Sequence, residues 1–314
     1  MFEHIFTVLI AALPVFIIVF IGVGLRRGKV IDSVIDQGVT KLLLNVLMPC
    51  FILDSIIGSD VASDLPKVLS LAGIGAAIIY ISLAITYAFS PLLGMGNGAG
   101  RRSFAVGAGL QNYGFLAVPL LISLYGDKEL VATLYMHSLG VEIALYTAAI
   151  AIFTGKFSLN PKMLLKGPII AIFIGILLNV TELYQYIPSA VMTSIGMLGE
   201  TAIPLSLLAV GMSIGEILPE TKYSFKVSLS AILFRLVILP AMIIGFAFLL
   251  PMDDSVKRVL LIQAAMPAAL FPIVLARHYG GKPALVAEIA IITSVVSFIT
   301  MPVVIVFGSK WLGI

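Results

Sequence analysis

The fold is decided by two stretches of sequence, Gln111-Asn112-Tyr113-Gly114-Phe115-Leu116-Ala117-Val118-Pro119 and Ala264-Ala265-Met266-Pro267-Ala268-Ala269-Leu270-Phe271-Pro272. Each lies in a long apolar run and contains residues that interrupt helices: proline lacks a backbone N–H and clashes with the preceding turn, and glycine weakens a helix. Backbone groups freed by such an interruption cannot face lipid, but they can line a cavity. A single proline is an ordinary kink, whereas two interruptions flanked by glutamine, asparagine and tyrosine favour a binding site. The candidate binding residues are Gln111, Asn112, Tyr113, Gly114, Gln263, Pro267 and Ala268, and the helix-break residues are Pro119 and Pro272.

Composition places the chain in a membrane. Of 314 residues, 60% are apolar and 11% are charged, whereas soluble domains have about 45–50% apolar and about 25% charged residues. A net charge of +3 is too small and too dispersed for a nucleic-acid-binding protein. The single cysteine, Cys50, excludes an intrachain disulfide and a cysteine-based metal site. We expect no cofactor, apart from a coupling ion that is either a proton or sodium.

Ten apolar runs are long enough to cross a hydrocarbon core, which takes about 20 residues. They cover residues 5–25, 39–58, 68–92, 103–125, 130–154, 164–183, 190–215, 223–250, 257–277 and 284–308. Only short connections remain, so any function lies within the bilayer. The sequence therefore predicts an all-α polytopic membrane protein with ten transmembrane helices.

The distribution of basic residues predicts the orientation, because Lys and Arg gather on the cytoplasmic side. Arg26 and Arg27 follow the first span instead of preceding it, which is unlike a signal peptide and places the N-terminus outside. The inward loops then hold most of the basic residues: Arg26, Arg27, Lys29, Lys41, Arg101, Arg102, Lys156, Lys162, Lys166, Lys222, Lys226, Arg277 and Lys282. The outward side holds Lys67, Lys128, Lys257, Arg258 and Lys310. We expect an integral membrane protein with both termini outside.

The two halves of the chain resemble each other at an offset of about 154 residues. The matching pairs are Pro49 with Pro204, Pro119 with Pro272, and Tyr125-Gly126 with Tyr279-Gly280. We predict a first five-helix repeat at residues 1–154, a short cytoplasmic linker at 155–163 and a second repeat at 164–314. Because five is odd, the second repeat is inverted, and inverted repeats are typical of secondary transporters.

Three ionisable residues, Arg235, Glu142 and Glu200, fall at a similar depth within their spans. A charge at the bilayer centre costs about 2.5–3.5 kcal/mol, so each requires a partner or a function. One interpretation makes Arg235 the partner of a substrate carboxylate or of Glu142, with Glu142 as a proton-coupling site. The other is a permanent structural ion pair between Glu142 and Arg235. For Glu200 a structural role is favoured.

These motifs together resemble the auxin efflux carrier family, as a bacterial-type member within the bile acid/arsenite/riboflavin transporter-like superfamily. The resemblance covers essentially the whole chain and rests on motifs in four spans. The fourth span has Asn112, Pro119, Leu120-Leu121 and Tyr125-Gly126, and the ninth has Gln263-Ala264-Ala265-Met266-Pro267, Phe271-Pro272 and Leu275-Ala276-Arg277-His278-Tyr279-Gly280. The second has Leu44-Asn45-Val46-Leu47-Met48-Pro49, and the seventh has Ala209-Val210-Gly211-Met212-Ser213.

The resemblance implies a fold in which broken helices four and nine cross at the midplane. It implies a scaffold of helices one, two, six and seven, against which the other six helices move as an elevator. Members carry organic anions, auxin in plants and dicarboxylates such as malate or malonate in bacteria. The resemblance to bacterial-type members implies a bacterial inner (cytoplasmic) membrane. Plant members place an acidic residue in the third helix, whereas this third span has no charge, so coupling to sodium, to protons or to neither stays open.

We therefore predict a carrier, not an enzyme, that moves a small mono- or dicarboxylate or an auxin-like acid. The expected partners are this anion and the lipid bilayer, and we expect no nucleic acid. A homodimer through the scaffold helices stays an open alternative. A sodium-coupled bile-acid-type symporter and a channel are the alternatives. The match of Gly211-Met212-Ser213-Ile214-Gly215 to G-x-S-x-G requires a strand-to-helix elbow and a histidine partner, and we attribute it to chance.

Overall fold

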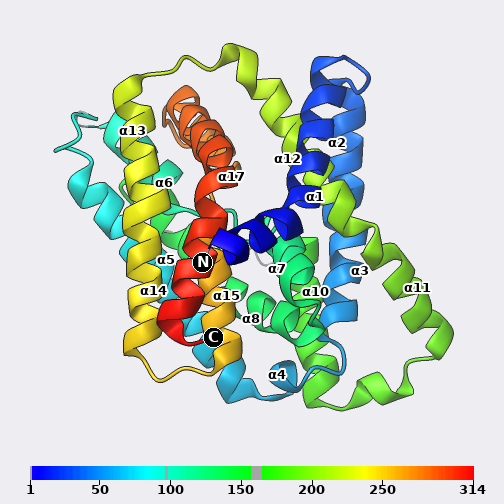
Figure 1. Cartoon of the computed structure of the whole chain (residues 1–314). Coiled ribbons are helices and arrows are strands. Elements are labelled where there is room, and N and C mark those ends of the chain that lie inside the picture. Colours follow the sequence, from blue (N-terminus) through cyan, green and yellow to red (C-terminus); the bar gives the residue numbers. More distant parts are fainter. Residues whose placement is uncertain (1, 96–97, 157–164) are drawn as a thin grey trace.

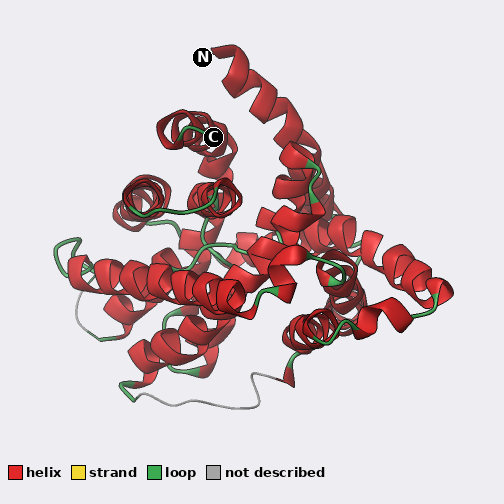
Figure 2. Ribbon diagram, turned by 90° about the horizontal axis from the view of Figure 1, so that it is seen from below, coloured by secondary structure: helices red, strands yellow, loops and turns green. Residues whose placement is uncertain are grey.

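The computed structural model describes residues 2–95, 98–156 and 165–314, and all regular structure in these ranges is helical (Figures 1 and 2). Seven of the described helical segments are long and apolar enough to cross a membrane: 4–27, 33–56, 65–89, 128–154, 189–220, 225–249 and 283–312. A further apolar helix, α10 (Gly167–Val180), is shorter. Lys162 and positions 157–163 of the predicted linker lie outside the described residues.

The first half of the chain begins with α1 (Phe2–Arg27). Its other elements are α2 (Ser33–Leu42), the π-helical turn η1 (Leu43–Leu47), α3 (Met48–Ile56), α4 (Asp60–Ser63), α5 (Leu65–Phe89), α6 (Ala99–Gly109), α7 (Ala117–Tyr125), α8 (Lys128–Ala144), the π-helical turn η2 (Leu145–Ala149) and α9 (Ile150–Thr154). Asp32, Asp64 and Asp127 accept hydrogen bonds from the first-turn amides of α2, α5 and α8. These caps fix where the helices begin.

The second half begins with α10. It continues with η4 (Leu183–Tyr186), α11 (Ser189–Glu200), α12 (Ala202–Ile217), η5 (Leu218–Glu220), α13 (Phe225–Leu233), the π-helical turn η6 (Phe234–Ile238), α14 (Leu239–Leu249), α15 (Asp254–Ala265), α16 (Phe271–His278) and α17 (Pro283–Leu312). The G-x-S-x-G match lies inside α12 and not in a strand-to-helix turn. There the α-carbon of Gly211 is so close to α1 that an added Cβ would lie 2.0 Å from the Val19 carbonyl oxygen.

The fourth and ninth predicted spans are each divided into two short helices. Residues 110–116 separate α6 from α7, and residues 266–270 separate α15 from α16. The breaks include Gly114 and Pro267 and end before Pro119 and Pro272, the two residues expected to break the helices. Pro119 and Pro272 lie in the first turns of α7 and α16, where the missing N–H has no acceptor to lose.

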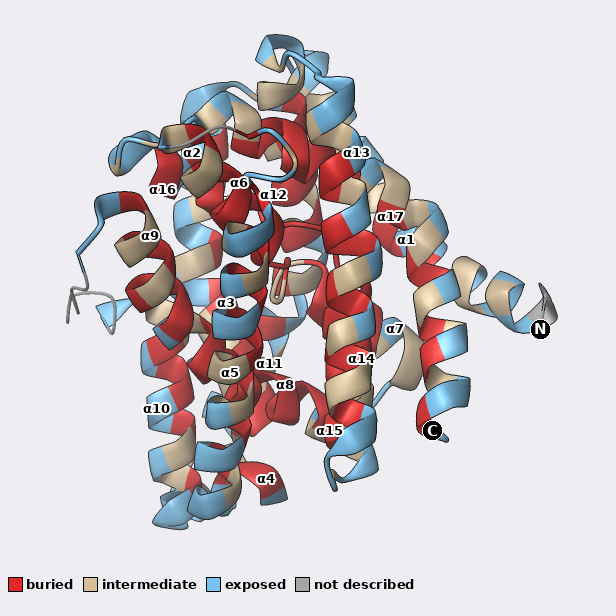
Figure 3. Cartoon of the chain, turned by 90° about the vertical axis from the view of Figure 1, so that its left-hand side faces the viewer, coloured by how far each residue is buried: buried red, intermediate tan, exposed pale blue. Residues whose placement is uncertain are grey.

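The helices form two sets that are visible as the two sides of Figure 1. In one set α1 packs on α12, and α3 packs on α10 and α11; in the other, α5 packs on α8, and α17 packs on α6, α13, α14 and α15. Small residues allow the closest approaches, as is usual between membrane helices: a Cβ on Gly140 of α8 would lie 1.7 Å from the Ala72 carbonyl oxygen of α5. Buried residues gather on the faces that these helices turn toward one another, and the outer faces are exposed (Figure 3).

Candidate functional site: the crossing of two helix breaks

The two helix breaks lie against each other and pair through their backbones. The Asn112 amide donates to the Pro267 carbonyl at 2.9 Å, and the Ala269 amide donates to the Leu110 carbonyl at 2.9 Å. Gln111 and Ala268 form the antiparallel bridge between them. Leu110 and Met266 leave their helices in extended conformation, as expected for Met266 because it precedes a proline. The pairing satisfies part of the backbone that each break frees.

Side chains from three elements surround this crossing. Gln111 Nε2 donates to Gln263 Oε1 at 3.4 Å, and Gln263 Nε2 donates to the Tyr113 carbonyl at 3.2 Å. The Ala268 amide donates to Thr293 Oγ1 of α17 at 3.1 Å. Both glutamines are fully buried. These hydrogen bonds tie the crossing to α15 and α17.

Arg235 brings a positive charge to the crossing. It lies in the π-helical turn η6 and is 0% exposed, and its Nη1 donates to Gln111 Oε1 at 3.4 Å. Its Nε and Nη2 have no hydrogen-bond partner among the described residues. Single π-helical turns occur frequently at functional sites, and an unpaired buried charge is costly. The guanidinium therefore offers unused donors beside the crossing.

Glu142 contacts the crossing through Tyr113. Its Oε1 accepts a hydrogen bond from the Tyr113 hydroxyl, and its Oε2 has no partner in the described part of the chain. The ion pairs among the described residues are Arg26 with Glu216, Lys67 with Asp253, Lys128 with Asp54 and Lys257 with Asp254. Glu142 and Arg235 thus contact different residues, Tyr113 and Gln111, instead of each other.

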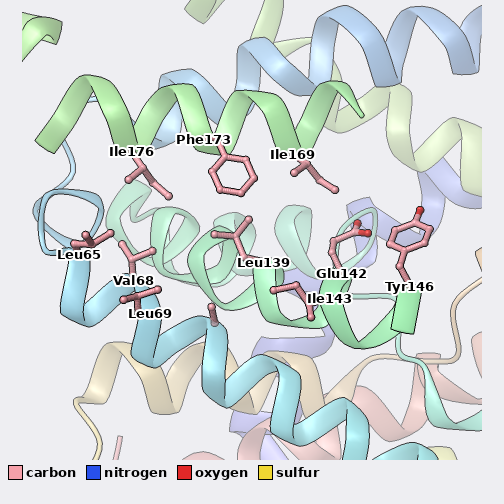
Figure 4. Close-up of a pocket in the computed structure, with 11 residues that line it drawn as sticks. Leu65, Val68, Leu69, Leu139, Glu142, Ile143, Tyr146, Ile169, Phe173 and Ile176 are labelled. Carbon is pink, nitrogen blue, oxygen red and sulfur yellow. The ribbon is translucent and has the colours of Figure 1, made fainter. Parts of the chain in front are cut away.

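Glu142 also lines a cavity of about 240 Å³ between α5, α8 and α10. Figure 4 shows Glu142 and Tyr146 on the α8 side of this cavity, with Ile169 and Phe173 of α10 opposite. Apart from the carboxylate and the Tyr146 hydroxyl, the labelled lining side chains are aliphatic or aromatic. At the start of α10, Lys166 Nζ lies 4.4 Å from the ring centroid of Tyr146 and 4.6 Å from that of Phe271.

The remaining candidates lie as follows. Asn112 is 7% exposed, and its side chain makes no hydrogen bond to the described residues. Gly114 lies within the first break, and Pro267 and Ala268 form the second. Glu200 is exposed at the end of α11, away from these contacts.

Sequence analysis missed Thr293, Lys166 and Glu288. Thr293 and Lys166 reach the site only through tertiary packing, so no local signal marks them. Glu288 is a carboxylate near the start of the predicted tenth span, and its hydrogen-bond partners lie at the start of α13. It is buried and accepts hydrogen bonds from the Ser224 amide at 2.7 Å and from the Ser228 hydroxyl at 2.8 Å.

Comparison with known proteins accounts for almost the whole chain. The profile of one family, described as membrane transport protein, matches twice, over residues 7–158 and 156–305. The chain belongs to this family, that of the auxin efflux carriers. An uncharacterised transporter of Methanothermobacter thermautotrophicus is 24% identical, and the match covers 92% of this chain and 95% of the relative. An uncharacterised transporter of Methanocaldococcus jannaschii is 26% identical over 61% of this chain, and the match spans 63% of that relative's length.

Proposed function

We propose that this integral membrane transporter is a secondary carrier of a small organic anion, a mono- or dicarboxylate such as malate or malonate or an auxin-like acid. The observation that carries the proposal is Arg235, a fully buried guanidinium that contacts Gln111 and has two donor groups without a partner among the described residues. A planar guanidinium matches a carboxylate in geometry and charge. The first turns of α7 and α16 follow the breaks and add the positive ends of two helix dipoles.

The binding residues in this proposal are those of the crossing. Arg235 binds the carboxylate, and the free side chain of Asn112 donates to it or accepts from a substrate hydroxyl. Gln111 and Gln263 fix the geometry, because each already bonds to other parts of the crossing. Glu142 is the coupling site: one of its oxygens is bonded to Tyr113 and the other is free to take a proton.

Transport in this proposal is by an elevator in which inverted repeats, residues 1–154 and 164–314, exchange conformations. The equivalent helix pairs lend support: α1 packs on α12 as α10 packs on α3, and α5 packs on α8 as α13 and α14 pack on α17. The set containing α1, α3, α10, α11 and α12 is the scaffold, and the other set carries the crossing.

Counterflow in proteoliposomes tests the proposal. Vesicles with purified protein are loaded with unlabelled malate, malonate or indole-3-acetate, and uptake of the labelled acid is measured with and without sodium. Saturable uptake that requires the internal acid is expected for at least one of them. Ion currents without saturation would identify a channel instead, and uptake that requires sodium would replace Glu142 protonation with a sodium-coupled mechanism.

A further inference from the structure

A second cavity lies apart from the crossing, at the end of the bundle that carries most of the basic residues. It has a volume of about 860 Å³ and lies between α5, the start of α6 and the η2–α9 segment. It is lined by Tyr80, Tyr87, Gly98, Arg101, Arg102, Ala148, Ala151, Ile152 and Gly155. None of these residues belongs to the crossing, so the transport site does not explain the cavity.

Two guanidinium groups lie at one end of this cavity and are held in place. Arg101 Nε donates to the Tyr87 carbonyl at 3.1 Å, and its guanidinium carbon lies 3.9 Å from the Tyr87 ring centroid. Arg102 Nη1 donates to the Phe153 carbonyl at 2.7 Å, and its Nε is buried without a partner among the described residues. Neither arginine has a carboxylate within ion-pair distance in the described ranges, and the residues outside those ranges include no Asp or Glu.

Further positive charge surrounds the pair. Both arginines lie in the first turn of α6, an 11-residue helix whose N-cap is Gly98, so the positive end of its dipole adds to the field. Lys282 Nζ lies 3.8 Å from the position that a Cβ on Gly100 would take. No acidic side chain is among the described residues that line the cavity. The chemistry of this end therefore fits a phosphate group.

The other end of the cavity is apolar. Tyr80 and Tyr87 are seven residues apart on α5, which corresponds to about 10 Å of helix. Over this length the facing residues are Ala148, Ala151 and Ile152. The Tyr80 hydroxyl is already bonded to Thr147 Oγ1 at 2.8 Å, and Tyr80 is 38% exposed, so the groove opens sideways. A free phosphate cannot contact these apolar side chains favourably, whereas the glycerol backbone and an acyl chain of a lipid can pack against them.

We propose that this groove binds one anionic glycerophospholipid, with its phosphate on Arg101 and Arg102 and an acyl chain along Tyr80, Ala148 and Ile152. Basic pockets between membrane helices on the cytoplasmic side commonly hold such head groups. The arginine pair supplies charge-assisted, fork-shaped donors, and the groove reaches from the interface into the apolar layer. The inference is independent of the transported solute.

Native mass spectrometry and thermal unfolding of the delipidated full-length protein test this inference. Phosphatidylglycerol is compared with phosphatidylcholine of the same acyl chains, and with inorganic phosphate and glycerol 3-phosphate. We expect phosphatidylglycerol alone to stay bound and to raise the unfolding temperature. Equal stabilisation by the soluble phosphates would show an anion site instead, and equal binding of phosphatidylcholine would show that charge does not select the lipid; either result overturns the proposal.

The variant R101Q/R102Q locates the site. Because the variant removes charge-assisted hydrogen bonds to the phosphate, phosphatidylglycerol binding should weaken by about tenfold or more. The matched control is K257Q/R258Q, another tandem basic pair whose Arg258 lies 5.5 Å over the Tyr125 ring; it should retain binding. If R101Q/R102Q does not fold, a photoactivatable phosphatidylglycerol on the wild-type protein must label peptides that contain residues 80–87, 98–102 or 148–155. Labelling elsewhere, or a variant with unchanged lipid preference, refutes the proposal.

Discussion

The backbone amide of Asn112 lies 2.9 Å from the carbonyl oxygen of Pro267, so two segments 155 residues apart in sequence share a hydrogen bond in the middle of the helical bundle. The bond joins the two breaks back to back and leaves their side chains to surround the crossing. A break in a single helix would leave its peptide groups without partners. The two breaks therefore stabilise each other.

Arg235→Gln separates a binding role from a structural one. Removing a buried charge that has no acidic partner among the described residues should leave the unliganded protein equally stable or more stable. Anion binding, measured by the shift in unfolding temperature, should weaken by about tenfold or more. The control is Lys226→Gln. Lys226 is exposed and lies on α13, which precedes η6, so this substitution should change neither the stability nor the anion affinity. Lower stability with unchanged anion affinity would make Arg235 a structural residue.

Asn112→Ala and Gln263→Ala should have opposite effects. The Asn112 side chain makes no bond to the described residues, so its removal should weaken substrate binding and leave the fold intact. Gln263 bonds to Gln111 and to the Tyr113 carbonyl, and its removal takes the partner from Gln111 Nε2 and from the Tyr113 carbonyl, at a cost of about 1–3 kcal/mol. Unfolding temperatures with and without substrate distinguish the two. Unchanged substrate affinity in Asn112→Ala would remove that residue from the site.

Gly140→Ala tests the close packing of α5 on α8. The added methyl group would lie 1.7 Å from the Ala72 carbonyl oxygen, so the helices must separate, at a cost of about 1–3 kcal/mol. The control is Gly73→Ala on α5, where nothing lies within 4 Å of the new Cβ and the higher helix propensity of alanine should be neutral or stabilising. Equal unfolding temperatures for the two variants would contradict the packing described here.

Glu288→Ala removes the acceptor at the start of α13. The Ser224 amide and the Ser228 hydroxyl would both lose their carboxylate partner, which should cost about 0.5–2 kcal/mol, as for other helix caps. Glu220→Ala, an exposed glutamate at the end of η5, is the control. Transport by the folded protein should persist, since the hydrogen bonds of Glu288 join it to Ser224 and Ser228 at the start of α13 and not to the described residues of the crossing.

Sequence predicted the helical class and the two interruptions, because proline and glycine act locally and apolar length is read directly from the chain. It named Pro119 and Pro272 as the helix-break residues, whereas the breaks cover residues 110–116 and 266–270, which include Gly114 and Pro267 but not these two prolines. The reason is that a helix accepts proline in its first turn, so Pro119 and Pro272 begin the following helices. Proline and glycine in the sequence thus predict that a helix is interrupted more reliably than they predict at which residue the interruption begins.

The contacts within the site were beyond the reach of sequence. Arg235 and Gln111 are 124 residues apart, and equal depth in two spans does not say which residues face each other. Equal depth left two interpretations open, an ion pair between Arg235 and Glu142 or a substrate carboxylate as the partner of Arg235. In the structure Arg235 donates a hydrogen bond to Gln111, and Glu142 accepts one from Tyr113. The rotation of each helix and the π-helical turn η6 decide where these side chains point.

Glu142 makes the coupling mechanism testable through pH. Protonation of its carboxylate removes a negative charge from the Tyr113 side of the crossing, so anion affinity should rise as pH falls, by about tenfold for a typical coupling energy. Glu142→Gln resembles the protonated form and should bind the anion tightly at every pH, as measured by calorimetry over a pH series. Glu200→Gln, which alters an exposed glutamate on α11, should keep the wild-type pH dependence. If Glu142→Gln also keeps the wild-type pH dependence, the coupling proton binds elsewhere. If wild-type transport requires sodium and Glu142→Gln removes that requirement, the carboxylate binds sodium.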